Sequence, residues 1–125
     1  MSHGKFGTAI NCMDGRTQDP VSKWMKTKYG LDYVDTITEP GPDKIIADGI
    51  QPNLDSIKTR LLISVEKHGS KVVAIVAHDE CAGNPVSKEE HLAHVKKSAE
   101  VVRAWGLGLE VVTVWVNNKW ELEEV

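Results

Sequence analysis

The sequence is poor in three features: cysteine, long apolar runs and blocks of basic residues. It contains two cysteines in 125 residues, and its formal net charge is −3. Because it has no basic block and no aromatic residues interleaved with basic ones, we exclude nucleic acid as the main partner. No segment approaches the roughly 18 consecutive apolar residues of a membrane-spanning helix, so we expect no membrane partner.

The scarcity of cysteine also bears on the compartment and the chemistry. Residues 1–4 carry no apolar signal-peptide core, so we expect a cytoplasmic protein. Cysteines in a reducing compartment stay thiols, which favours metal binding or catalysis over a disulfide. No C-x-x-C motif occurs, which disfavours a dithiol redox protein. The length suits one core, and we predict a single domain over residues 1–125.

One apolar stretch organises the chain. Residues 72–77 are continuously apolar, which is typical of a strand buried on both faces of a parallel sheet. His78 follows directly, and Cys81 comes three residues later. Open α/β folds build their sites where a strand leaves the sheet. An imidazole and a thiolate at such a position are suitable ligands for Zn²⁺.

A second group of polar residues follows an earlier strand. Residues 5–11 have the pattern of a short strand, and Cys12 comes next. Asp14 and Arg16 lie two and four residues further on, so one tight turn brings a thiol, a carboxylate and a guanidinium together.

The remaining segments alternate between helix and strand. We expect helices at about 20–28, with Asp19 as cap, at 54–68, with Asn53 as cap, and at 88–104, where Ser87 and Glu90 match a capping box. Further strands are expected at 33–38 and 111–116. Residues 43–52 are expected to form a loop with one helical turn at 44–47. Asn117 and Asn118 predict a two-residue turn into an antiparallel edge ribbon at 119–122.

Together, C-x-D-x-R after one strand and H-x-x-C after a later one resemble the β-class carbonic anhydrases. The resemblance covers most of the chain. It implies that Cys12, His78 and Cys81 bind zinc and that Asp14 and Arg16 form a catalytic dyad beside the metal. It also implies a carbonic anhydrase-like lyase, in which a zinc-bound hydroxide hydrates carbon dioxide to bicarbonate or attacks a closely related small electrophile.

The alternation of elements predicts an α/β fold with three layers, α/β/α, and a mainly parallel sheet. If the strand order is 2-1-3-4, the first and third strands are neighbours at the topological switch point, which places Cys12 beside His78 and Cys81. The family resemblance implies the same order. We add the C-terminal segment as an antiparallel edge strand.

Other interpretations of these residues remain open. Cys12 and Cys81 could be small buried apolar residues. The zinc could instead be structural, with Asp14 as a permanent fourth ligand of a non-catalytic domain. His91 and His94 are interpreted as surface residues, and Asp79 and Glu80 as solvated carboxylates. The four tryptophans are interpreted as core or interface anchors: Trp24, Trp105, Trp115 and Trp120.

The sheet is small, and this suggests self-association. Trp115 and Trp120 fall on the predicted edge ribbon, where another chain would cover their apolar surface. We therefore expect a homodimer or a higher homo-oligomer.

Overall fold

A five-stranded sheet forms the centre of the computed structural model, which describes residues 4–125. Met1, Ser2 and His3 lie outside the described residues. The elements are β1 (Phe6–Cys12), α1 (Gln18–Tyr29), β2 (Tyr33–Glu39), α2 (Pro42–Asp48), α3 (Asn53–His68), β3 (Val72–His78), α4 (Lys88–Ala104), β4 (Glu110–Val116) and β5 (Leu122–Glu124).

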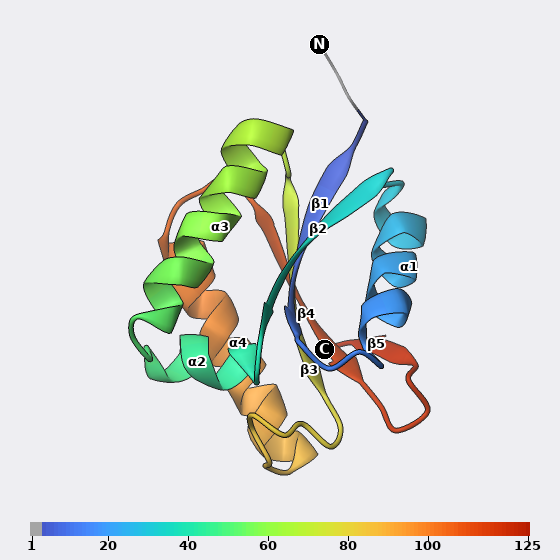
Figure 1. Cartoon of the computed structure of the whole chain (residues 1–125), viewed down its shortest axis with the longest axis vertical. Coiled ribbons are helices and arrows are strands. Elements are labelled where there is room, and N and C mark those ends of the chain that lie inside the picture. Colours follow the sequence, from blue (N-terminus) through green and yellow to red (C-terminus); the bar gives the residue numbers. More distant parts are fainter. Residues whose placement is uncertain (1–3) are drawn as a thin grey trace.

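The strand order is β2-β1-β3-β4-β5. β1 pairs in parallel with β2 and β3, β3 pairs in parallel with β4, and β5 runs antiparallel to β4 at the edge. α1 covers one face of the sheet, and α2, α3 and α4 cover the other (Figure 1). The predicted α/β class, the strand order and the antiparallel C-terminal edge strand are confirmed.

The sequence of the central strand β3 is continuously apolar because both of its faces are buried. All seven of its residues are buried. Val73, Ile75 and Ala77 point into the core under α2, α3 and α4, whereas Val72, Ala74 and Val76 point into the core under α1. Successive side chains alternate between two faces, and here both faces are dry.

Four local expectations are wrong. Asn53 does not cap α3, because it is the first residue of the helix and Pro52 stands at the cap position. Residues 43–52 are not mainly a loop, because α2 forms a helix whose Ile45 and Ile46 are buried in the core. Asp19 does not cap α1, since the helix begins at Gln18 and Asp19 lies in its first turn. The C-terminal turn is longer than two residues, because Asn117 bonds back to Glu121 and the edge strand starts only at Leu122.

One of the two hydrogen bonds of the capping box predicted before α4 is present: Ser87 Oγ accepts from the Glu90 backbone N–H at 3.2 Å.

Within the part of the chain that the structure describes, no helix has the length and apolar character of a membrane span.

Candidate metal centre

Three side chains from two strand ends converge at the carboxyl edge of the sheet. Cys12 is the last residue of β1, His78 is the last residue of β3, and Cys81 follows in the next turn. Because β1 and β3 are parallel neighbours, their ends meet at the same edge. One ligand atom of each side chain lies within 4.8 Å of the others, and all three residues are buried. The predicted juxtaposition across the switch point therefore exists in the fold.

The two sulfurs are free thiols rather than a disulfide. Their Sγ atoms are 3.9 Å apart, far beyond the length of about 2.05 Å of a covalent S–S bond. The hydrogen bond from the Cys81 thiol lowers the pKa of Cys12 to about 4, although burial opposes this. The same contact, together with burial, raises the pKa of Cys81. The pair therefore shares one proton, which a metal ion would displace.

His78 is oriented as a ligand. Its Nδ1 lies 2.6 Å from the backbone oxygen of Asp79, and since a carbonyl oxygen only accepts, Nδ1 carries the proton. The other ring nitrogen, Nε2, is buried and makes no hydrogen bond of normal geometry. Burial opposes a charged ring, but the Cys12 sulfur and the Asp79 carbonyl beside it raise the pKa of His78. A buried nitrogen without a partner is costly. A metal ion between Nε2 and the two sulfurs would satisfy it, and a backbone carbonyl on the other ring nitrogen is the usual support for a metal-binding histidine.

The Asp14 carboxylate is held by Arg16 in a fork. Arg16 donates from its backbone N–H and its Nε to Oδ1, at 2.9 and 3.1 Å, and from Nη2 to Oδ2 at 2.7 Å. These hydrogen bonds lower the pKa of Asp14 to about 2. Asp14 is not a member of the group of three converging ligands. The fork therefore holds the carboxylate beside the cluster but apart from it.

The start of α1 fixes the turn that carries this dyad. Gln18 Nε2 donates to the backbone oxygens of Cys12 and Asp14, at 2.7 and 3.2 Å. Thr17, which is completely buried, donates its hydroxyl to the same Asp14 oxygen at 2.8 Å. The turn is therefore anchored to a helix rather than left as a loose loop.

Two glycines let the loop of Cys81 pack against the turn after β2. A Cβ on Gly83 would lie 2.4 Å from the backbone carbon of Pro40, and a Cβ on Gly41 would lie 2.9 Å from the backbone carbon of Gly83. No other residue type fits such a close approach of two backbones. This packing brings the backbone N–H of Gly41 to the Cys12 sulfur and those of Gly83 and Asn84 to the Cys81 sulfur.

A buried polar cluster ties the same two segments together. Asn84 Nδ2 donates to Asp43 Oδ2 at 3.1 Å, and His91 Nδ1 donates to the same oxygen at 2.6 Å. Each of these three side chains is about 1% exposed. Asn84 also donates to Nδ1 of His94 at 2.9 Å. The prediction that His91 is a surface residue is therefore wrong, because it is the partner of a buried carboxyl group; His94 is partly buried.

Sequence reasoning also missed Trp120. Its ring lies over the Arg16 guanidinium, with the central carbon 4.4 Å from the ring centroid, and its centroid is 6.4 Å from that of His78. Trp115 is 3% exposed and belongs to the core. Its interpretation as a core anchor is confirmed, and the expectation that a partner chain covers it at the edge ribbon is wrong. Neither placement follows from sequence spacing alone.

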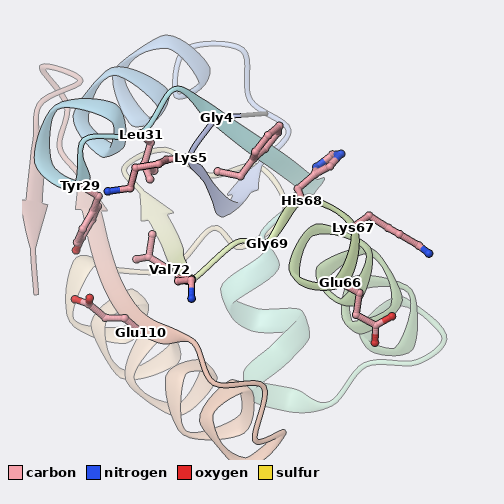
Figure 2. Close-up of a pocket in the computed structure, with 12 residues that line it drawn as sticks. Gly4, Lys5, Tyr29, Leu31, Glu66, Lys67, His68, Gly69, Val72 and Glu110 are labelled. Atoms are coloured by element: carbon pink, nitrogen blue, oxygen red, sulfur yellow. The ribbon is translucent and has the colours of Figure 1, made fainter. Parts of the chain in front are cut away.

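A large cavity lies elsewhere. It has a volume of about 830 Å³ and is lined by residues at the start of the strands, among them Phe6, Val72 and Glu110. Figure 2 shows Tyr29, Leu31 and His68 around it. Cys12 and His78 stand at the other end of β1 and β3. This cavity is therefore separate from the metal centre.

The chain is thus an α/β protein whose buried Cys12, His78 and Cys81 could hold a metal ion at the switch point of a sheet with strand order β2-β1-β3-β4-β5. A family model described as "Putative carbonic anhydrase" matches residues 2–125, and the chain belongs to that family. A search of curated protein sequences gave no match.

Solved structures of fungal β-carbonic anhydrases share the fold. The enzyme CafA of Aspergillus fumigatus is 20% identical, with a TM-score of 0.55, over 99% of this chain and 76% of its own. A tetrameric β-carbonic anhydrase of Sordaria macrospora is 14% identical, with a TM-score of 0.63, over 100% of this chain and 82% of its own. A mutant of CafD of A. fumigatus is 14% identical, with a TM-score of 0.59, over 99% of this chain and 91% of its own.

Proposed function

We propose that this protein is a zinc enzyme that hydrates carbon dioxide to bicarbonate, or attacks a closely related small electrophile such as a sulfur analogue. The observation that carries the proposal is the convergence of Cys12, His78 and Cys81 beside an Asp14 carboxylate that Arg16 holds in a fork. Family membership supports the same assignment.

The donor set suits zinc. Two thiolates and a neutral imidazole are ligands that Zn²⁺ takes in tetrahedral sites, and three protein ligands leave one position open, as in catalytic sites. When bound, the ion supplies a Lewis acid that makes water acidic enough to attack carbon dioxide near neutral pH. Two thiolates neutralise the charge of the ion, so a water bound there would be a weaker acid than one at a site of three histidines. The neighbouring side chains therefore matter more for the reaction.

Asp14 supplies the orienting acceptor. Its pKa of about 2 keeps the carboxylate ionised near neutral pH, so it is too weak a base to take a proton there. It can instead accept a hydrogen bond from a reactant at the fourth position and so fix its direction. Arg16 holds the carboxylate in place and prevents it from becoming the fourth ligand itself.

The test combines metal content with stopped-flow hydration. Purified under metal-free conditions and reconstituted, the wild-type protein should hold about one zinc per chain and accelerate carbon dioxide hydration. Cys81→Ser should lose the metal, because a neutral hydroxyl is a poor zinc ligand near neutral pH. Substoichiometric zinc that dialyses easily from the wild-type protein would contradict the assignment, and so would full zinc occupancy without hydration.

A further inference from the structure

The hairpin between β4 and β5 places an aromatic ring over the residue that holds Asp14. The Trp120 centroid lies 4.4 Å from the central carbon of the Arg16 guanidinium and 6.4 Å from the centroid of the His78 ring. We propose that Trp120 is a positioning residue: its ring confines Arg16 to the fork with Asp14 and so keeps Asp14 from becoming the fourth ligand of the metal. This inference rests on the proposed zinc site.

The hairpin is built to present this ring. Trp120 has a φ of +60°, a left-handed conformation that bulky residues rarely adopt. Hydrogen bonds of Asn117 hold it there: its carbonyl accepts from the Trp120 backbone N–H, and its side-chain oxygen accepts from the N–H groups of Lys119 and Glu121. A strained backbone that neighbouring bonds over-determine often marks a functional position.

Arg16 needs such restraint because it is otherwise only loosely packed. Its side chain is 49% exposed, and apart from Asp14 it lies 3.9 Å from the carboxylate of Glu80, which is itself 69% exposed. A guanidinium stacked on an indole is attracted electrostatically to the ring face and loses water on that side. The ring therefore restricts the rotation of Arg16 away from the carboxylate.

Loss of the ring should act on the metal through Asp14. If Arg16 spends more time in solvent, the carboxylate is freed and can compete for the fourth coordination position. The site would then be closed for a larger fraction of the time. An exogenous ligand must displace Asp14 from a closed site, so its apparent affinity reports the closed fraction.

The experiment uses azide as the probe on cobalt-substituted protein. Cobalt(II) accepts the same ligands as zinc and absorbs visible light, so an azide titration can be followed spectroscopically. Trp120→Leu should raise the ratio of closed to open sites roughly two- to fivefold, the worth of one partly exposed stacking contact, and weaken azide binding by up to that factor. Trp120→Phe should restore most of the affinity, because a ring face remains.

Two controls separate positioning from general damage. Trp24→Leu removes a different indole ring, whose centroid lies 5.1 Å from Lys28 Nζ. This variant should leave the azide affinity unchanged. In an Asp14→Ala background no carboxylate is available to close the site, so Trp120→Leu should then have no effect. Circular dichroism and thermal unfolding of each variant show that it is folded.

Two results would overturn the proposal: an unchanged azide affinity in Trp120→Leu, or an equal loss in the Asp14→Ala background. Failure of the proposed function itself gives a different result. In that case the wild-type protein shows no thiolate-to-cobalt absorption, or it binds azide normally yet does not hydrate carbon dioxide.

Discussion

Replacing Asn84 with Ala tests whether the buried polar cluster supports the metal centre. Asn84 stands three residues after Cys81, its backbone N–H faces the Cys81 sulfur, and its side chain donates a hydrogen bond to Asp43 on α2. Asp43 itself stands two residues after Gly41, whose backbone N–H faces the Cys12 sulfur. A single side chain thus links the two segments that contact the two sulfurs.

The magnitude follows from the lost bonds. Asn84 gives one hydrogen bond to the Asp43 carboxyl group and one to His94, at 3.1 and 2.9 Å. A buried bond to a charged group contributes about 1.5–3 kcal/mol and one between neutral groups about 1 kcal/mol. Asp43 already has one oxygen without a partner. We therefore expect Asn84→Ala to lower the free energy of unfolding of the metal-free protein by about 3 kcal/mol.

Zinc binding should weaken as well, because the backbone N–H groups on the sulfurs lose their alignment. Loss of support around metal ligands typically costs about 10–100-fold in affinity. Urea unfolding of the metal-free protein and zinc competition with a chromophoric chelator measure the two effects. Asn118→Ala, at an exposed turn position, is the matched control. An Asn84→Ala protein with both quantities unchanged would refute the argument.

Two further predictions concern packing and assembly. Gly83→Ala should lower the free energy of unfolding by about 1–3 kcal/mol and weaken zinc binding, because the new Cβ would lie 2.4 Å from the backbone carbon of Pro40. Urea unfolding and chelator competition measure the two effects. Gly15→Ala is the control and should change neither quantity, because its Cβ would meet nothing within 4 Å. Light scattering at micromolar concentration should give a dimer, because β2 is an edge strand of the sheet formed by residues 4–125 and its Tyr33 is 53% exposed. A monomer would contradict this.

The main elements were predictable because their signals are local. A short, continuous apolar run such as that of β3 is typical of a strand buried on both faces. The apolar residues of α3 and α4 recur at helical spacing. Cys12, Asp14 and Arg16 lie within one turn, so their proximity follows from the chain itself. The neighbouring placement of β1 and β3, by contrast, needed the resemblance to a known family as well.

The parts that sequence reasoning missed depend on contacts between distant segments. His91 lies on a largely polar helix, and only its partner Asp43, far away in sequence, explains its burial. α2 is short, with Ile45 and Ile46 as its main apolar signal, and its stability comes from packing on the core. Trp120 faces Arg16 because Trp120 itself has a left-handed backbone conformation in the turn, and no pattern of side chains predicts that conformation.

The central claim is that Asp14 is held off an open zinc site, and one paired measurement tests it most directly. Zinc affinity and stopped-flow carbon dioxide hydration should be measured together on wild type, Asp14→Ala and Arg16→Ala. We predict an active wild type, an Arg16→Ala variant that keeps its zinc but hydrates more slowly, and an Asp14→Ala variant with undiminished zinc affinity. An inactive wild type whose zinc affinity falls on Asp14→Ala would show that Asp14 is a permanent ligand and would reject the enzymatic assignment.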